Sequence, residues 1–377
     1  MKLRRLKAVA KKELLHIVRD PRSLALALLQ PLVMLLLYGY ALTLDVDRIP
    51  TYIYDQDRTP QSRELIDQFR GSRYFQILDT VNNYKTIERG IDQSKILLSI
   101  VVPPLYSHHL NAGEEAQVQI LVDGSDSNTA GIALGYAESV VAAYAAQLKS
   151  DAQMRRGGQP MRIPVEPRIR VWYNSDLKSR NYIVPGLIAV TMMMIASMLS
   201  SLTIAREWEN GTMEQLLSTP VRPGELVLGK LLAYFMLGIA DMLIAIVVGV
   251  FAFQVPFRGN VAFLMFTSCL FLLGALAWGI FLSATSRSQL MAYQLGMLSS
   301  FLPAYLLSGF IYSIQNMPKV IQAISYAVPA RYFVTILNGV FLKGVGLRIL
   351  GFEVFLLTVY AVLVFIGTAR KMRVKVA

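Results

Sequence analysis

The chain has 377 residues, 54% of them apolar, and a mean hydropathy of +0.45. Soluble domains are roughly 45–50% apolar, so this composition favours an integral membrane protein over a soluble enzyme. The net charge of +12 could suit nucleic acid, but the basic residues gather beside apolar runs. We therefore expect membrane lipid, and no nucleic acid, as a partner.

Residues 1–22 carry eight Lys and Arg against two acids, and they are predicted to form a cytoplasmic amphipathic elbow helix. Asp20-Pro21 is expected to break this helix, because proline has no amide hydrogen to donate. The face expected to lie along an anionic membrane surface consists of Leu3, Leu6, Ala10, Leu14 and Ile17.

Residues 23–44 are uncharged and long enough for a first transmembrane helix, which needs about 20 apolar residues. This run is too long for the core of a signal peptide, and no small-residue cleavage pattern follows it. We expect it to remain as an anchor. Pro31 within it is tolerable where neighbouring helices satisfy the freed carbonyl.

Residues 45–180 are predicted to form an extracytoplasmic α/β domain inserted between transmembrane helices 1 and 2, because apolar strand-like runs alternate with helical patterns. The strand order cannot be read from the sequence. The only cysteine, Cys269, lies in an apolar run, so no intramolecular disulfide can form. The expected strands are Ile49–Tyr54, Tyr74–Leu78, Ile96–Val102, Val118–Val122 and Val165–Tyr173, and the expected helices are Pro60–Arg70, Tyr84–Gln93 and Thr129–Ser150.

Residues 130–148 could be taken for a further span, since Glu138 is their only charge. They are rich in Ala, Gly and Tyr rather than Leu or Ile, and a seventh span would place the two basic ends of the chain on opposite sides. We therefore expect a helix of the external domain, in which Gly131 and Gly135 make a packing contact.

Residues 181–369 are predicted to contain transmembrane helices 2–6, which gives a polytopic α-helical membrane protein with six spans. The runs 181–205, 259–286 and 288–318 are uncharged, 231–255 contains only Asp241, and 349–369 contains Glu353 near one end. Residues 316–347 are too broken to cross and are expected to form an outer re-entrant segment. Residues 370–377 form a basic tail, and by the positive-inside rule both termini are expected to be cytoplasmic.

Residues 206–230 form a polar insert between two apolar runs and are predicted to be a cytoplasmic docking loop. Thr212 and Gln215 have the spacing of a capping box at the start of a short helix. Met213, Leu216 and Leu217 would then share an apolar face surrounded by acids. The alternative is an ordinary cytoplasmic turn with solvated charges.

Two charged residues lie in otherwise apolar surroundings. Asp241 either lines a polar translocation path or hydrogen-bonds a neighbouring helix, and the second interpretation is slightly favoured, because a buried acid needs a partner or water. Arg331 either anchors its segment at the outer interface or takes part in substrate exit, and we favour the anchor.

The sequence contains no constellation suited to catalysis, to a metal or to a cofactor. Gly224–Lys230 resembles a phosphate-binding loop, but Leu231 replaces the Ser or Thr that would hold magnesium. His108 and His109 are adjacent, which points their rings apart. We therefore expect no ATP site in this chain.

The segment REWENGTMEQLLSTP, residues 206–220, resembles the coupling-helix region of type-2 ABC exporter permeases. The resemblance covers essentially the whole chain and is strongest to the drug-efflux-type permeases with a large periplasmic domain. It also rests on Lys12-Glu13, Arg19-Asp20-Pro21, the span from Gln30-Pro31 to Gly39-Tyr40, Asp123–Asp126, Leu307–Phe310 and Pro329–Phe333.

This resemblance implies a cell inner membrane protein that works with a second permease chain, as a homodimer or a heterodimer. Separate ABC ATP-binding subunits would supply ATP hydrolysis, and a periplasmic adaptor could meet the external domain. The cargo would be drugs or other hydrophobic compounds. The ATPase-coupling residues implied are Arg206, Glu207, Glu209, Gly211, Thr212, Glu214, Leu216, Leu217 and Pro220.

Two alternative functions remain open at this point. The exporter could carry a lipid or a lipid-linked conjugate, although polysaccharide exporters resemble shorter permeases. The chain could also be a membrane sensor that does not transport and needs no ATPase partner.

Overall fold

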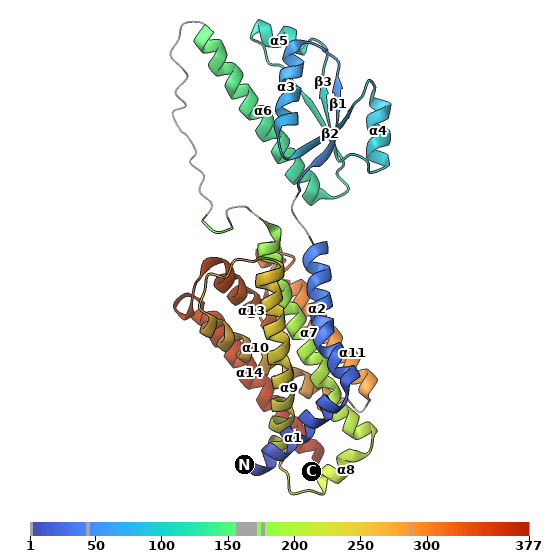
Figure 1. The fold of residues 1–377 in the computed structure, drawn as a ribbon, viewed down its shortest axis with the longest axis vertical. Helices are drawn as coiled ribbons and strands as arrows, with labels where there is room; N and C mark the ends of the chain where they lie inside the picture. Colours follow the sequence, from blue (N-terminus) through green and yellow to red (C-terminus); the bar gives the residue numbers. More distant parts are fainter. Residues whose placement is uncertain (1–2, 43–45, 156–171, 175–177, 287, 377) are drawn as a thin grey trace. The chain divides into compact units, whose positions relative to one another are not determined.

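The computed structural model describes residues 3–42, 46–155, 172–174, 178–286 and 288–376 (Figure 1). The chain divides into two compact units. The first consists of Met1–Thr43 and Val171–Ala377, and the second of Leu44–Arg170. We call them the membrane unit and the sheet unit.

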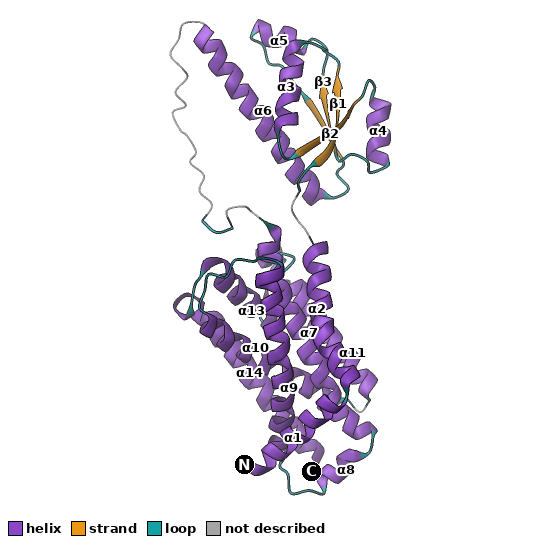
Figure 2. Cartoon of the chain, viewed as in Figure 1, coloured by secondary structure: helices purple, strands orange, loops and turns teal. Residues whose placement is uncertain are grey.

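The sheet unit contains a four-stranded sheet, coloured orange in Figure 2, with the order β2-β1-β3-β4. The strand β1 pairs in parallel with β2 and β3, whereas β3 pairs antiparallel with β4. Parallel neighbours need a helical crossover, which α3 and α4 provide. The strands are β1 (Ile49–Asp55), β2 (Phe75–Thr80), β3 (Leu98–Val102) and β4 (Gln119–Val122), and the helices are α3 (Pro60–Gly71), α4 (Tyr84–Asp92), α5 (Tyr106–Ala112) and α6 (Ser127–Arg155).

Both faces of this sheet are covered. On one face Leu98 and Ile100 pack with Leu65 and Phe69 of α3 and Ala137 of α6. A smaller cluster on the other face joins the sheet to α4 (Figure 2). Because both faces of the sheet are covered, all five residues of β3 are buried, and four of the five are apolar.

The helix α6 contains the apolar stretch 130–148. It is not among the described helices that are long and apolar enough to span a membrane, and it buries Ala133 and Tyr144 against the sheet core. Of the fifth expected strand, residues 165–171 lie outside the described residues, and Trp172 and Tyr173 are not in a strand. The helix α5 was not predicted from the sequence.

The membrane unit is helical. Five of its described helices are long and apolar enough to cross a membrane, and a bent pair gives a sixth if it counts as one span. The helix α2, predicted as the first span, has an apolar part of only Ala27–Ala41. The helices of this unit are α1 (Leu3–Arg19), α2 (Pro21–Ala41), α7 (Ser179–Glu209), α8 (Thr212–Leu217), α9 (Pro223–Val247), α10 (Val261–Thr285), α11 (Gln289–Leu307), α12 (Lys319–Ser325), α13 (Pro329–Asn338) and α14 (Leu347–Val376), with π-helical turns η1 (Val248–Ala252) and η3 (Gly339–Lys343) and a 3-10 turn η2 (Ile314–Asn316).

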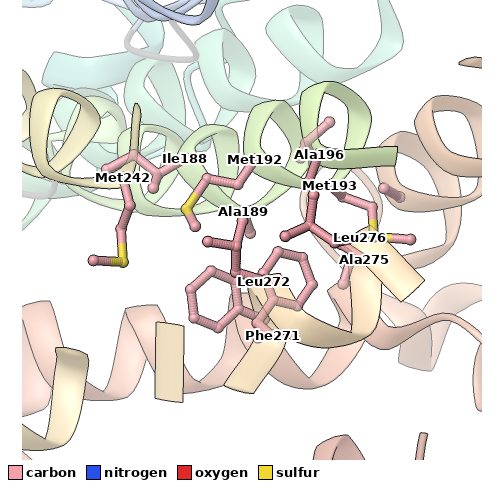
Figure 3. Packing of buried hydrophobic residues seen from close by; sticks show 14 of the residues in the cluster. Ile188, Ala189, Met192, Met193, Ala196, Met242, Phe271, Leu272, Ala275 and Leu276 are labelled. Carbon is pink, nitrogen blue, oxygen red and sulfur yellow. The ribbon is translucent and has the colours of Figure 1, made fainter. Parts of the chain in front are cut away.

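The central helix of the unit is α7, which contacts α2, α9, α10, α11 and α13. Its methionines and small residues pack against α10, as Figure 3 shows for Met192, Met193 and Ala196 facing Leu272 and Leu276. Gly279 permits the closest approach of these two helices. A Cβ atom at this position would lie 2.3 Å from the Ser197 carbonyl oxygen.

Three sequence boundaries were wrong. The span predicted for 288–318 ends as a helix at Leu307. The predicted docking loop 206–230 is shorter, because α7 continues through Glu209 and α9 already begins at Pro223. Helical hydrogen bonding therefore extends beyond the apolar runs at both ends of the loop.

The predicted re-entrant segment 316–347 contains α12 and α13 with η3, and these two helical parts are bent by 85° to each other. The second part is deeply packed, since Phe333 stacks on Phe271 of α10 with ring centroids 4.2 Å apart. Proline at the start of α13 supplies the preset backbone angle with which a helix can begin after such a bend.

The helix α1 ends before Pro21, as predicted. Its buried stripe differs from the predicted face, because Leu6, Val9, Glu13 and Ile17 pack inward while Leu3 and Leu14 are exposed. Gly229 of α9 admits this contact, since a Cβ atom there would lie 2.6 Å from a Val9 methyl group. The α1 helix is therefore fixed to α9.

Candidate coupling site

The predicted docking loop contains one short helix between two long ones. The six-residue α8 begins at Thr212, directly after Gly211, whose φ of +69° turns the chain out of α7. Glycine suits this left-handed conformation, because it has no Cβ atom to clash. The predicted capping box is wrong: Gly211 is the cap residue, and the Thr212 hydroxyl donates to the Glu207 carbonyl oxygen at 3.4 Å.

The apolar face of α8 is turned into the protein. Met213 is fully buried in the core of the membrane unit, and Leu216 packs half-buried against the same core. The Leu217 side chain lies outside the described residues. The expected apolar contact face is therefore used to hold α8 in place, and Glu214 and Gln215 are left exposed.

Glu207 does not form part of an acidic rim, because it is buried in a cluster of four charged side chains. Its Oε1 accepts from Lys12 Nζ at 2.8 Å and lies 3.0 Å from Lys230 Nζ. Lys230 also donates to Glu13 Oε1 at 2.8 Å. This cluster joins α1, α7 and α9 behind the loop, and an unpaired charge at that depth would cost several kcal/mol.

The side chains of this cluster stabilise one another's charged forms. Burial works to raise the pKa of Glu13, but the charges and hydrogen bonds of Lys230 and Lys12 outweigh it, so the pKa is lowered from 4.5. Burial likewise works against the charged form of Lys12, yet Glu207 and Glu13 raise its pKa above 10.5. Both side chains therefore stay charged at neutral pH.

Two further residues of the loop region tie α7 to α11. Glu209 Oε2 accepts a hydrogen bond from the backbone N–H of Gln289 at 2.7 Å and so caps the start of α11. The negative charge of Glu209 also interacts favourably with the positive end of the helix dipole there. Arg206 Nε donates to the Gln289 side chain at 3.3 Å. Arg206 Nη1 donates to His16 Nε2 at 2.9 Å, since a guanidinium has no acceptor.

The residues that remain exposed define what we call the coupling surface. It contains Glu209, Gly211, Thr212, Glu214 and Pro220, together with Asn210, Gln215, Ser218, Thr219 and Arg222. Arg5 of α1 donates to the Pro220 carbonyl oxygen, so this surface is also held from the amino-terminal helix. Glu225 accepts from the Arg222 amide at 3.1 Å and fixes the far end of the loop.

The predicted translocation residues lie apart from this surface. Asp241 is buried on α9 beside a hollow of about 10 Å³, room for roughly one water. Its Oδ1 has no hydrogen-bond partner among the described residues. Arg331 donates to the Gln322 carbonyl oxygen at 3.2 Å and lies over the Tyr326 ring, with Cζ 3.8 Å from its centroid. Arg331 thus joins α13 to α12.

Sequence reasoning missed Lys230 and Gln289 as parts of the site. Lys230 was considered only as part of a chance phosphate-loop pattern, and that segment forms the first turns of α9. A lysine at the edge of a long apolar run carries a signal for an acidic partner, but the identity of that partner depends on tertiary contacts. Among the described residues no group of three potential metal ligands occurs.

Comparison with known proteins shows which family the chain belongs to. The model of the family described as ABC-2 family transporter protein matches residues 21–370. The chain belongs to the ABC-2 transporter family. It is therefore the permease subunit of an ABC transporter and a multi-pass membrane protein, in a family whose permeases work with ATP-binding subunits.

Individual relatives named as permeases match most of this chain. The chain is 37% identical over 342 residues to the Escherichia coli protein named "Probable multidrug ABC transporter permease YbhS", and the match covers 90% of this chain and 89% of the relative. It is 31% identical to the E. coli relative named YbhR, with 92% of both chains covered. The "Linearmycin resistance permease protein LnrN" of Bacillus subtilis is 23% identical, with 91% and 92% covered.

Proposed function

We propose that this permease exports drugs or other hydrophobic compounds, and that separate ATPase subunits drive it by docking on the coupling surface. The observation that carries this proposal is the bracing of a small exposed loop by a buried charge cluster and by contacts to α1, α7, α9 and α11. A loop fixed at so many points can pass a movement of the docked ATPase to the membrane helices, whereas a flexible turn would change its own conformation instead.

The proposed mechanism is a shift between conformations of the paired permeases. ATP binding would favour one arrangement of the docked subunits, and the coupling surface would bias the helices accordingly, since a ligand shifts an equilibrium only through its differential affinity. The second permease would be another copy or a related chain. The names of the E. coli and B. subtilis relatives support a drug as cargo.

Association with the ATPase provides the first test. The full permease with Glu214→Lys should retain less ATPase subunit when the two are co-purified in mild detergent, because Glu214 is exposed at the centre of the coupling surface. Glu138→Lys, an exposed charge reversal in the sheet unit, is the matched control. Equal retention of the ATPase by both variants would remove Glu214 from the contact.

The proposed orientation places six spans in the cell inner membrane, both termini in the cytoplasm and residues 45–180 outside. The basic ends of the chain support it through the positive-inside rule. Single cysteines introduced at Trp208 and at Glu138 in a Cys269→Ser background should be labelled from opposite sides. Labelling of position 208 only from the periplasm and of position 138 only from the cytoplasm would reverse the assignment, and labelling of both from one side would contradict it.

A periplasmic adaptor is proposed as the partner of the external domain. Replacement of residues 45–170 by a short linker should leave ATPase association intact, because the coupling surface lies wholly in the membrane unit. It should abolish export, because the adaptor would lose its proposed contact with the external domain. Loss of ATPase association in a well-expressed deletion variant would contradict this separation of roles.

A further inference from the structure

Two adjacent hollows lie beside the charge cluster and are lined by residues of α1, α2, α7 and α9. The larger is an open cavity of about 450 Å³ whose lining includes the charged or polar side chains of Lys12, His16 and Arg206. The smaller, of about 70 Å³, shares His16, Arg206 and Tyr234 with it. The wider cavity and the narrower hollow, which we call the slot, therefore share one wall. The slot's apolar lining consists of Ile17, Leu24, Ala27, Leu199, Leu202 and Leu237.

The charges around these hollows are balanced, with three cations and three acids. Lys12, Arg206 and Lys230 face Glu13 and Glu207 in the cavity, and Asp20 borders the slot. Lys230 is buried, so Lys12, with a side chain 55% exposed, and the half-buried Arg206 are the cations within reach of a ligand. A ligand of zero net charge fits this balance.

Glu207 indicates that the ligand should also carry a hydrogen-bond donor. Its side chain is only 7% exposed, it lines the cavity, and its Oε2 has no hydrogen-bond partner among the described residues. A buried carboxylate oxygen without a donor is costly. Because Oε2 is itself buried, a charged donor in the cavity would relieve that cost once the carboxylate turns toward it. Arginine and lysine in the cavity are suited to phosphate oxygens.

We infer that the two hollows bind one phospholipid whose headgroup carries a phosphate and a primary ammonium, as in phosphatidylethanolamine. The phosphate contacts Arg206 and Lys12, the ammonium donates toward Glu207, and one acyl chain enters the slot past Leu24. A cavity lined by charged side chains beside an apolar slot suits the headgroup and the acyl chain of such an amphiphile. The bound lipid would fix α1 to the coupling region.

Lipid titration of the purified, delipidated full-length permease, followed by native mass spectrometry, tests the inference without ATPase or export. Phosphatidylethanolamine should bind about tenfold more tightly than phosphatidylcholine of the same chains, because a trimethylated ammonium cannot donate a hydrogen bond. Phosphatidylglycerol, which lacks the ammonium, should also bind about tenfold more weakly. Equal binding of the three lipids would overturn the inference.

Matched substitutions locate the site. Arg206→Gln should weaken phosphatidylethanolamine binding about tenfold, whereas Arg4→Gln, at an exposed position on α1, should not. Leu24→Trp should block the slot, whereas Leu29→Trp, exposed on the same helix, should leave binding unchanged. If Leu24→Trp retains full binding, or the soluble headgroup glycerophosphoethanolamine binds as tightly as the lipid, the slot plays no part and the inference is wrong.

A basic side chain of the ATPase could fill the same cavity, and accessibility of a cysteine distinguishes this outcome. His16→Cys in a Cys269→Ser background should be protected from a thiol reagent by phosphatidylethanolamine alone. Protection that requires the ATPase and is unaffected by lipid would make the cavity a protein-docking pocket and contradict the lipid site. Lipid binding and thiol protection are measured without transport, so their outcome does not depend on whether the permease exports drugs.

Discussion

Lys230 Nζ lies 2.8 Å from Glu13 Oε1, although 217 positions separate the two residues along the chain. Both side chains are buried, and Lys230 is only 1% exposed. Since each ion depends on the other for compensation, this contact makes the position of α1 depend on the first turns of α9. The same ammonium also contacts Glu207, so the end of α7 belongs to the arrangement.

Lys230→Met should destabilise the permease by about 3–5 kcal/mol, because it leaves Glu13 and Glu207 with Lys12 as their remaining partner in the cluster. Thermal unfolding of the purified full-length chain in mild detergent measures the effect. Lys11→Met, an exposed position on α1, should change the unfolding temperature little. Equal unfolding temperatures for the two variants would show that the buried cluster contributes no net stability.

The stability of this cluster should depend on acid pH. The folded-state pKa of Glu13 is lowered from 4.5, so its contribution is fully present above that value and is lost as the pH falls through the lower folded-state pKa. Unfolding temperatures measured between neutral pH and about pH 3 should therefore decline mainly below pH 4.5. Glu13→Gln should flatten this decline. An unchanged slope in that variant would assign the acid sensitivity to other carboxyl groups.

Helix packing in the membrane unit can be tested at two glycines. Gly279→Ala should destabilise the permease by about 1–3 kcal/mol, since the added Cβ atom would lie 2.0 Å from Ser200 Oγ and 2.3 Å from a backbone carbonyl. Gly367→Ala on α14 meets no atom within 4 Å and should be neutral or stabilising by about 0.5–1 kcal/mol. Thermal unfolding compares them, and a Gly279→Ala variant as stable as the parent would contradict the close approach of α7 and α10.

The turn at Gly211 should be sensitive to the backbone angle rather than to volume. Gly211→Ala places a Cβ atom at a φ of +69°, at a cost of about 1–2 kcal/mol, and Gly211→Asn should cost less because asparagine tolerates this conformation. ATPase association should fall in the same order, alanine below asparagine. Gly224→Ala at the start of α9, with open space around it, is the control. Equal association in both Gly211 variants would mean that the turn does not set the docking geometry.

Much of the fold is visible in the sequence, because its patterns are local. The strands β1, β3 and β4, the break at Pro21 and the polar segment between α7 and α9 follow from apolar runs, proline and charge. The strand order does not, since parallel neighbours are joined by tertiary packing. Residue Met213 shows the same limit: its spacing predicts an apolar face on α8, but whether that face points outward or into the core depends on α7 and α9.

In the predicted coupling segment, the structure gives several side chains roles that differ from those expected from the sequence. Glu207 and Glu209 read as exposed acids in a polar insert, and the structure pairs Glu207 with two lysines and places Glu209 on the start of α11. Sequence periodicity does not reveal these partners, because Lys12 and Gln289 come from distant parts of the chain. The residues left for a partner protein are therefore fewer than the motif suggests.

Asp241 is the remaining acid of interest, since it is buried on a membrane helix with an oxygen that lacks a partner among the described residues. Such a residue costs stability, and intramembrane acids are typically retained for function. Asp241→Leu should therefore raise the unfolding temperature, lower the export rate and leave ATPase association unchanged. Export from cells or vesicles, measured beside co-purification of the ATPase, separates these effects.

Ser268→Ala provides the control for Asp241, because it also removes a buried oxygen that has no partner among the described residues, but on α10 and without a charge. This variant should become slightly more stable and should export normally. If Asp241→Leu also exports at the normal rate, the carboxyl group has no part in the translocation path. If both variants lose export, the loss follows from altered helix packing, and the acid itself is not required.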